Sequence, residues 1–344
     1  MKRKFLIIGS GYRAAFYARI ALGLPEMYEV PLMYCRSDEK AAKMRKLCHI
    51  FTTTSIDDCL AYGADFAVVA VNKASIAKVS VQWAGYGIPV LAETPIGMTS
   101  SDLKLVEDAL HQGRHIECAE QYRYEPVHSA WLSVLKTGII GEVSQMTCSA
   151  GQYYHGFDLI TSYLQSERIP CDIHAFSYSA PLIETDSREG LITDRRKKLE
   201  TRTSAVLKFE NGKQAFYDYT DVQDRSLIRR KYFNVRGTAG EITNARISFV
   251  NQAGHVENYK LKRKLKQDGS GTAALYLKDT CVYANPYPSS SLSDDETSMA
   301  LCMDRLFDKR DPESIRDALY DAKFRICMED AVHTPFILVH CQPD

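Results

Sequence analysis

Short apolar runs alternate with amphipathic stretches along the first third of the chain. Buried strands are predicted at 4–8, 28–34, 66–72, 89–92 and 115–119, and helices at 15–22, 39–47, 75–86 and 101–111. Strands that alternate with helices of this length indicate βαβ units and a parallel sheet covered on both faces. The pattern therefore predicts an α/β domain over residues 1–119, with a ligand at the carboxyl ends of its strands and under the second domain.

The pattern changes character after residue 119. Strands are predicted at 143–149, 203–209, 213–220, 232–235, 245–250 and 255–261, and helices at 126–136, 156–164, 294–307 and 312–331. The dipeptide Asn211-Gly212 between two strands is a strong hairpin signal. Strands joined mainly by hairpins indicate an antiparallel sheet with one open face, and 166–198 and 262–271 are expected to be loops. Residues 120–344 are therefore predicted to form an α+β domain.

A glycine turn follows the first predicted strand directly, in the sequence Gly9-Ser10-Gly11-Tyr12-Arg13-Ala14. Gly9 permits a tight turn, Gly11 lets a pyrophosphate approach the backbone, and Ala14 lets the following helix pack on the strand. The free N–H groups of the first helical turn would then face the anion. This context predicts a Rossmann dinucleotide-binding domain. The alternative is a glycine-rich turn that binds nothing.

The end of the second predicted strand distinguishes the two nicotinamide cofactors. An acid there binds the ribose 2′-hydroxyl of NAD, whereas an arginine accommodates the 2′-phosphate of NADP. Here the strand ends in Cys35-Arg36-Ser37, and the first acid is Asp38. Arg36 matches a phosphate in charge and Ser37 offers a hydroxyl, so NADP(H) is favoured over NAD(H). The alternative is NAD bound through Asp38, with Arg36 on the surface.

Composition excludes several other classes of protein. Lys plus Arg and Asp plus Glu number 43 each, so no net charge favours a nucleic acid or membrane partner. Apolar runs are far shorter than the roughly 20 residues of a membrane span, and the short run behind the basic start argues against a signal peptide. The ten cysteines form no Cys-x-x-Cys pair, which indicates free thiols in a reducing cytoplasm. No cluster of His and acidic residues has the spacing of metal ligands.

Several segments resemble the Gfo/Idh/MocA family of sugar and polyol oxidoreductases, in the family's order. They are Gly9–Ala14, Val69–Asn72, Pro89–Pro95, Gly138–Val143, His155–Leu159 and Gly237–Ile242. The resemblance covers most of the chain and implies a Rossmann domain followed by a domain whose open sheet often mediates dimers or tetramers. It also implies hydride transfer between a sugar hydroxyl carbon and nicotinamide. A homodimer or homotetramer that acts on a small-molecule sugar or polyol is therefore expected.

The chain departs from the family at two positions that matter for the chemistry. The family usually has Glu-Lys-Pro where this chain has Glu93-Thr94-Pro95, and that lysine normally contacts the substrate hydroxyl. Threonine cannot carry the positive charge that stabilises a forming alkoxide. The family also tends to have an aspartate where this chain has Gly151. The chain therefore resembles a divergent subgroup with Glu-Thr-Pro.

His155 remains the best candidate for proton transfer. It precedes a predicted helix with Asp158 within one turn, and the near-neutral pKa of histidine suits removal of a hydroxyl proton. The alternative is a residue that caps the helix start. Tyr153 and Tyr154 are expected to relay a proton, bind a sugar face or pack, and Glu120 to replace the missing acid or hold the structure.

The expected site residues fall into three groups. The catalytic residues are His155, Tyr154 and Glu120. The cofactor-binding residues are Gly9, Ser10, Gly11, Tyr12, Arg13, Arg36, Ser37, Val71, Asn72, Glu93 and Thr94. The substrate-binding residues are Tyr122, Tyr153 and Asp158.

Three functions are compatible with these patterns. The leading hypothesis is an NAD(P)-dependent oxidoreductase that acts on a sugar, a polyol or a related cyclic alcohol. The second is a redox-assisted eliminase or glycosidase that retains its cofactor. The third is a nucleotide-binding sensor or assembly protein without dehydrogenase activity, which the loss of the family lysine and aspartate favours.

Overall fold

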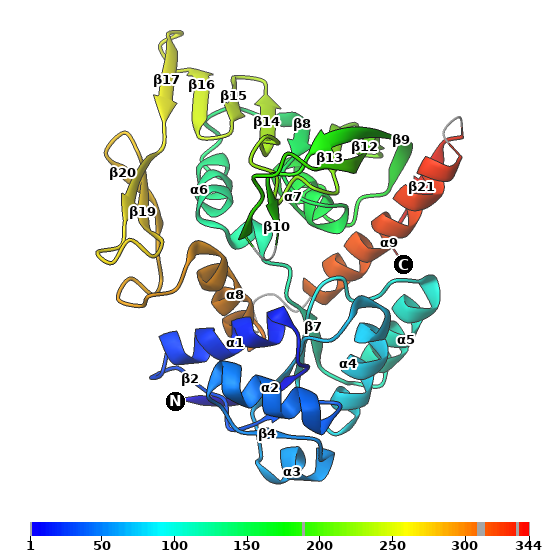
Figure 1. Cartoon of the computed structure of the whole chain (residues 1–344). Coiled ribbons are helices and arrows are strands. Elements are labelled where there is room, and N and C mark those ends of the chain that lie inside the picture. Colours follow the sequence, from blue (N-terminus) through cyan, green and yellow to red (C-terminus); the bar gives the residue numbers. More distant parts are fainter. Residues whose placement is uncertain (1, 188–189, 308–313, 335–336, 344) are drawn as a thin grey trace. The chain divides into compact units, whose positions relative to one another are not determined.

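The computed structural model describes residues 2–187, 190–307, 314–334 and 337–343 (Figure 1). Contacts divide the chain into a first unit, Met1–Pro126, Arg263–Ala274 and Ala284–Ala322, and a second unit, Val127–Lys262, Leu275–Tyr283 and Lys323–Asp344. The single boundary expected after residue 119 differs from this division, because the chain returns to the first unit twice. A linear pattern of strands and helices carries no record of such returns.

A parallel sheet forms the centre of the first unit. Its strands are β1 (Arg3–Ile8), β2 (Tyr28–Glu29), β3 (Met33–Tyr34), β4 (Thr52–Thr53), β5 (Phe66–Val69), β6 (Val90–Ala92) and β7 (Ile116–Cys118). The order is β4-β3-β1-β5-β6-β7, with β2 beside β1, and the pairs described for this sheet are parallel. Because right-handed crossovers lead away from β1 in both directions, helices cover both faces. The predicted Rossmann architecture is confirmed.

Except for the short helix at Ile56–Ala61, which was not predicted, the helices of the first unit follow the predicted ones within three residues at each end. They are α1 (Tyr12–Gly23), α2 (Asp38–Cys48), α3 (Ile56–Ala61), α4 (Ile76–Gly85), α5 (Ser100–His111) and α8 (Asp294–Arg305), with short 3₁₀ turns η1 (Lys73–Ser75) and η2 (Tyr122–Tyr124). In the core, Phe5 of β1 stacks on Phe66 of β5 with ring centroids 5.0 Å apart. Burial of each such ring stabilises the fold by roughly 1.5–3 kcal/mol. The strand predicted at 28–34 is interrupted, because Pro31 has no N–H to donate.

A nine-stranded sheet forms the centre of the second unit. Its order is β17-β16-β15-β14-β8-β13-β12-β9-β21, and among its described pairs β8 and β13 run parallel while the others are antiparallel. The strands are β8 (Val143–Ser149), β9 (Cys171–Ile183), β12 (Lys197–Phe209), β13 (Gln214–Thr220), β14 (Tyr232–Gly237), β15 (Gly240–Thr243), β16 (Arg246–Val250), β17 (Val256–Lys260) and β21 (Val339–Cys341). The hairpin predicted at Asn211-Gly212 joins β12 to β13, with Gly212 at φ +83°. The predicted open, mainly antiparallel sheet is therefore confirmed.

Helices cover one face of this sheet. They are α6 (Pro126–Leu135), α7 (Tyr154–Leu164) and the second part of α9 (Ser314–His333). The rings of Phe157 in α7 and Phe324 in α9 stack with centroids 3.8 Å apart. Trp131 of α6 donates its indole N–H to the carbonyl of Asn244, 2.6 Å away. These contacts join the helices to each other and to the sheet region.

The expectation of a loop at 166–198 was wrong. Thirteen of its residues form β9, which pairs with β12 along its whole length. The alternation that marks a strand is present only in the first part of β9, where Cys171, Ile173 and Ala175 are buried in alternation with more exposed residues.

The remaining strands are β10 (Asp186–Ser187), β11 (Gly190–Leu191), β18 (Lys262–Leu265), β19 (Thr272–Leu277) and β20 (Thr280–Ala284). Part of the predicted loop at 262–271 is therefore also strand.

A buried histidine should make the second unit sensitive to acid. Burial lowers the pKa of His128 from 6.5 to about 3, and the charge of Lys231 acts in the same direction. Between these two values the unfolded chain binds a proton that the folded chain does not. The free energy of unfolding should therefore fall by about 1.4 kcal/mol per pH unit as pH drops below 6.5.

The test compares urea unfolding of the wild type and His128→Asn at pH 7.5 and pH 5.0. The fluorescence of Trp131 in a Trp83→Phe background reports on the second unit alone. His128→Asn should lose about 2 kcal/mol less than the wild type on acidification, and the exposed control His174→Asn should match the wild type. Equal losses in all three proteins would contradict the assignment.

Candidate functional site

The predicted glycine turn joins β1 to α1 in the required geometry. Gly9 has φ +141°, and a Cβ built on it would lie 2.2 Å from the carbonyl oxygen of Ala70. Only glycine fits there, since the turn passes against the end of β5. Ala14 lies in the first turn of α1 and is fully buried, as the packing of this helix on the sheet requires.

The space beside Gly11 is open. A Cβ at this position would meet no heavy atom within 4 Å, although Gly11 is the N-cap residue of α1. Gly11 has no side chain that could cap the helix, so its first N–H groups are available to an anion. Ser10 is half-buried and Tyr12 is exposed. The residues present therefore fit a dinucleotide pyrophosphate.

The end of β3 carries the residues expected to select the cofactor. Cys35 is fully buried, and its thiol points to the carbonyl of Gly9 at 4.0 Å. Arg36 is exposed and follows it directly. Ser37 is the N-cap residue of α2, where its hydroxyl accepts a hydrogen bond from the N–H of Lys40. Asp38 accepts a hydrogen bond from the hydroxyl of Thr54, 3.1 Å away, and is thus already engaged.

The other expected cofactor residues follow the ends of β5 and β6. Val71 is half-buried and Asn72 is exposed. Glu93 is buried, Thr94 is half-buried, and the Thr94–Pro95 peptide bond is cis. Because β5 and β6 are parallel neighbours, these residues lie at the same edge of the sheet, where ligands of such folds bind.

Arg13 is placed differently from a phosphate ligand. Its Nε donates to Oε1 of Glu93 at 2.9 Å, and the hydroxyl of Tyr17 donates to the same oxygen at 2.9 Å. Burial alone lowers the pKa of Arg13, but the neighbouring Glu93 carboxylate raises it above its ordinary value. Burial and the same carboxylate raise the pKa of Tyr17. Arg13 therefore stays charged and Tyr17 stays neutral.

Glu120 and Tyr122 follow β7 in the first unit. Glu120 is 9% exposed, and its Oε1 lies 3.4 Å from the N–H of Tyr122. Its backbone carbonyl accepts from the thiol of Cys302 in α8. Glu120 thus makes structural hydrogen bonds through its side chain and its backbone, which favours the structural alternative over a catalytic role.

In the second unit, His155 lies inside the first turn of α7 rather than before it. The helix begins at Tyr154, and Tyr153 is its N-cap residue. Tyr153 has φ +40°, donates its N–H to the hydroxyl of Tyr217 at 2.7 Å and contacts Thr203 through its own hydroxyl at 3.3 Å. His155 is half-buried, and its ring centroid lies 4.3 Å from that of Tyr154.

Two expected site residues of this region are enclosed. Asp158 has no exposed surface, and Tyr154 is only 6% exposed. Direct contact between Asp158 and a substrate is therefore disfavoured, and we expect it to support α7 from within. Tyr153, by contrast, is half-buried.

Gly151 has no room for a side chain. A Cβ there would lie 2.8 Å from the backbone nitrogen of Gly156. In turn, a Cβ on Gly156 would lie 2.6 Å from the carbonyl oxygen of Gly151. The two glycines pack backbone against backbone, so this position cannot hold the aspartate of the resembled family without a shift of α7.

Solved structures of oxidoreductases superpose on nearly the whole chain. A levoglucosan dehydrogenase in complex with NADH and levoglucosan is 15% identical, with a TM-score of 0.72 over 99% of this chain and 100% of that one. An oxidoreductase from Agrobacterium radiobacter in complex with NAD+, L-tartaric acid and magnesium is 14% identical, with a TM-score of 0.68 over 98% of each chain. An oxidoreductase from Desulfitobacterium hafniense described as NADPH-dependent is 15% identical, with a TM-score of 0.66 over 99% of this chain and 98% of that one.

The chain has the fold of the Gfo/Idh/MocA oxidoreductases. No protein-family model matches the sequence, and no curated protein matches it. In this fold, the site residues that could not be recognised from the sequence are those that hold others in place. Tyr17 and Tyr217 are both buried, and each bonds a residue far away in the sequence. No local pattern marks such tyrosines.

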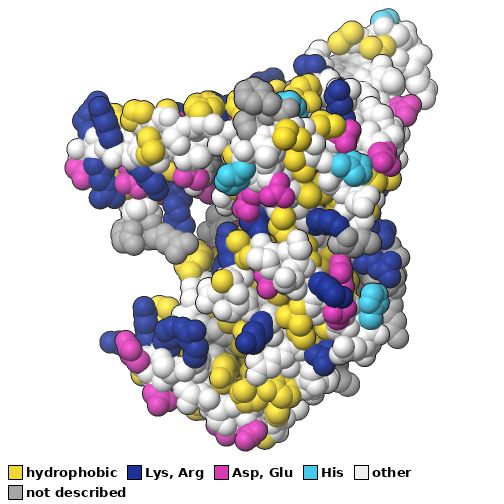
Figure 2. Space-filling model, turned by 90° about the vertical axis from the view of Figure 1, so that its right-hand side faces the viewer, with side chains coloured by type: hydrophobic (Ala, Val, Ile, Leu, Met, Phe, Trp, Pro, Cys, Tyr) yellow, Lys and Arg dark blue, Asp and Glu magenta, His cyan; other side chains and the backbone are white. Residues whose placement is uncertain are grey.

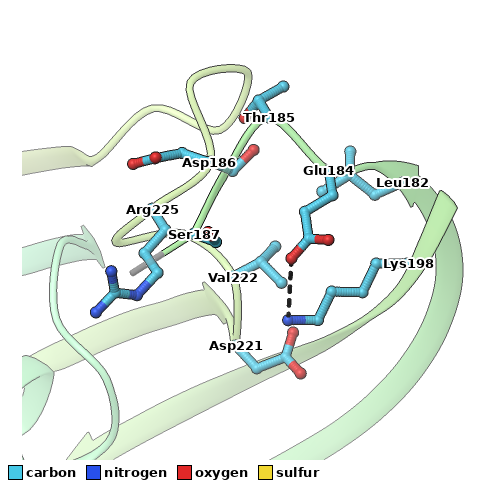
Figure 3. A pocket seen from close by; sticks show the side chains of 10 residues that line it. Leu182, Glu184, Thr185, Asp186, Ser187, Lys198, Asp221, Val222 and Arg225 are labelled. Carbon is cyan, nitrogen blue, oxygen red and sulfur yellow. Dashed lines mark ion pairs between the residues drawn. The ribbon is translucent and has the colours of Figure 1, made fainter. Parts of the chain in front are cut away.

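The second unit holds a cavity of about 270 Å³ (Figure 3). It is lined by Leu182, Glu184, Thr185, Asp186, Ser187, Lys198, Asp221, Val222, Arg225 and Ser226. Lys198 is the last of five consecutive charged residues at 194–198, and its ammonium pairs with Glu184 at 3.9 Å. Most lining side chains are polar, which suits a hydroxylated molecule better than an apolar one.

Surface and metal chemistry add little to the site. Basic and acidic side chains are interspersed over the face shown in Figure 2. Among the described residues, no helix is long and apolar enough to cross a bilayer. Within the same residues, no group of His, Cys, Asp and Glu side chains could hold a metal ion.

Proposed function

We propose that the protein is an NAD(P)-dependent oxidoreductase of the Gfo/Idh/MocA family that acts on a CH–OH group of a sugar, polyol or related cyclic alcohol. The observation that carries the proposal is the open space beside Gly11 at the uncapped start of α1. The levoglucosan dehydrogenase of the same fold supports the substrate class. When bound, the nicotinamide would exchange a hydride with the alcohol carbon.

His155 would take the hydroxyl proton in this reaction, and the phenol of Tyr153 would bind the substrate. Tyr217 holds the turn before His155 from both sides, because its hydroxyl accepts from Tyr153 and donates to the carbonyl of Gly151 at 3.2 Å. Burial raises the pKa of Tyr217, so it stays a neutral hydrogen-bonding group. Thr94 would supply no charge at the position of the family lysine.

The direct test is turnover of a panel of sugars and polyols with each cofactor, followed by the absorbance of reduced nicotinamide. Reduction of NADP+ or NAD+ by at least one of them supports the proposal. Failure of a cofactor-saturated protein with the whole panel would contradict it.

We further propose that NADP(H) is preferred, because Arg36 is exposed directly after β3 while Cys35 is buried. Arg36→Ala should weaken NADPH about 10- to 100-fold and change NADH less than threefold, since a hydrogen bond to a charged group contributes about 1.5–3 kcal/mol. Calorimetric titration measures both affinities. Lys43→Ala, an exposed charge on α2, is the control and should change neither. Tighter binding of NADH than NADPH by the wild type would overturn the preference.

A nucleotide-binding protein without dehydrogenase activity is the second candidate function. Two observations favour it, namely Thr94 in place of the lysine and the lack of space for an aspartate at Gly151. Such a protein would bind the dinucleotide with normal affinity and turn over no alcohol. The same panel therefore separates the two candidates.

We propose that the protein forms a homodimer or homotetramer in a reducing cytoplasm. Phe176, Tyr178 and Phe216 lie on the face of the nine-stranded sheet that α7 does not cover. They are 51%, 49% and 38% exposed. Exposed aromatic side chains on one sheet face are typical of protein interfaces. All ten cysteines are free thiols, which is compatible with a reducing compartment.

A further inference from the structure

Two donors of α1 converge on a single oxygen of Glu93. Arg13 and Tyr17 are four residues apart and lie on the same side of the helix. The Nε of Arg13 and the hydroxyl of Tyr17 both lie 2.9 Å from Oε1 of Glu93. Within the described residues, no hydrogen bond reaches Oε2 of Glu93. One carboxylate oxygen is therefore fixed, and the other is available.

The rest of the Arg13 guanidinium is engaged elsewhere in the first unit. Its Nη2 donates to Oε1 of Gln121 at 2.6 Å and contacts the sulfur of Met299 at 2.9 Å. Its Nη1 faces Asp295 of α8 at 3.8 Å. Gln121 in turn donates to Asp295. With Nε and Nη2 occupied and Nη1 beside a carboxylate, little of Arg13 remains for a phosphate.

The position of Glu93 in the sheet indicates which ligand group its carboxylate could bind. Glu93 follows the carboxyl end of β6 and is 7% exposed, and Gln121 lies in the segment after the neighbouring strand β7. Ligands of this fold bind at this edge of the sheet. A carboxylate can accept a hydrogen bond from a ribose hydroxyl, as the acid at the end of the second strand does for the adenosine-side ribose of NAD. The adenosine-side ribose is expected at the end of β3, on the other side of β1 from β6, which leaves the nicotinamide-side ribose for Glu93.

We propose that Arg13 is a positioning residue, which with Tyr17 fixes Oε1 of Glu93 so that Oε2 can accept a hydrogen bond from the nicotinamide-side ribose of the cofactor. This inference rests on the proposed function and deepens it. It assigns Arg13 an indirect role in place of the direct contact expected from the glycine motif.

The test compares two ligands that share the adenosine and the pyrophosphate. One is NADPH or NADH, whichever the wild type binds more tightly, and the other is ADP with the matching 2′ substituent, which lacks the nicotinamide-side ribose. In full-length Arg13→Met, the dinucleotide should bind at least tenfold more weakly and the ADP fragment within twofold of the wild type. Arg13→Lys should be intermediate, because lysine keeps the charge but not the planar fork.

Matched variants separate positioning from folding and from direct contact. Arg19→Met removes the ion pair between α1 and Glu296 of α8, whose atoms are 2.8 Å apart, and should change neither affinity. Glu93→Gln should reproduce Arg13→Met, and the double variant should be no weaker than either single one, because the two residues act as one unit. Tyr17→Phe keeps the packing, loses one hydrogen bond and should show a smaller effect on the dinucleotide alone.

Results that contradict the positioning role differ from those that contradict the proposed function. Equal weakening of the dinucleotide and the ADP fragment by Arg13→Met, or additive effects with Glu93→Gln, would overturn the positioning role and leave the proposed function intact. Unchanged dinucleotide binding in Arg13→Met and Tyr17→Phe would also overturn it. Failure of the wild type to bind either dinucleotide would overturn the proposed function itself, and this inference with it.

Discussion

Replacement of Gly11 by aspartate should leave the protein folded and abolish dinucleotide binding. Gly11 has φ −96° and ψ −174°, an extended backbone that any residue adopts, and a Cβ there meets nothing within 4 Å. Aspartate is also a good N-cap residue, so thermal stability should be unchanged or raised. Its charge would face the pyrophosphate, at a cost of about 4 kcal/mol for two charges roughly 4 Å apart, or about 10³-fold in affinity.

Two neighbouring substitutions are the controls for this result. Gly11→Ala adds the Cβ without the charge and should weaken binding much less. Gly9→Ala should instead destabilise the first unit, because its Cβ would lie 2.2 Å from the carbonyl oxygen of Ala70. Thermal unfolding and calorimetric titration distinguish the three variants. Unchanged affinity in a folded Gly11→Asp protein would show that this turn does not bind the pyrophosphate.

Replacement of His155 by alanine should lower kcat by about 10²–10⁴ while the dinucleotide affinity stays the same. A positioned general base contributes a factor of this size, and water replaces it poorly. His155 is half-buried in the first turn of α7, and that turn is held by Tyr217 through Tyr153 and Gly151. The measurement is turnover of the best alcohol in the panel under saturating cofactor.

The matched control is His174→Ala, which removes an exposed histidine of the same unit from β9. This variant should keep the wild-type rate. If His155→Ala retained activity within a few-fold of the wild type, the base would have to be another group, and the cofactor assignments would still stand. A loss of dinucleotide affinity in His155→Ala would point to a binding role instead of proton transfer.

Much of the architecture could be predicted because it depends on near neighbours in the sequence. Phe66–Val69 is a continuous apolar run, and a strand buried on both faces needs this pattern. Asn211-Gly212 specifies its own hairpin, because the turn geometry at Gly212 is a local property. The strand β9 was missed because its second half is exposed, so no alternation marks it.

The site was less predictable, because its polar contacts join residues far apart in the chain. Arg13 was expected among the cofactor-binding residues of the glycine motif, and its guanidinium is bonded to Glu93, 80 residues away, and to Gln121, 108 residues away. The absence of the family aspartate at Gly151 could be read from the sequence. The reason for it, contact with the backbone of Gly156, could not.

The sequence by itself therefore determined the parallel sheet, the glycine turn and the class of ligand that fits them. Strand periodicity and turn chemistry are set within a few residues, so they are visible in one dimension. Only the tertiary structure decided which side chains meet. In the folded protein Arg13 is bonded to Glu93, Asp158 has no exposed surface, and α8 belongs to the first unit. Such contacts depend on the packing of segments separated by tens to hundreds of residues, and no local pattern specifies that packing.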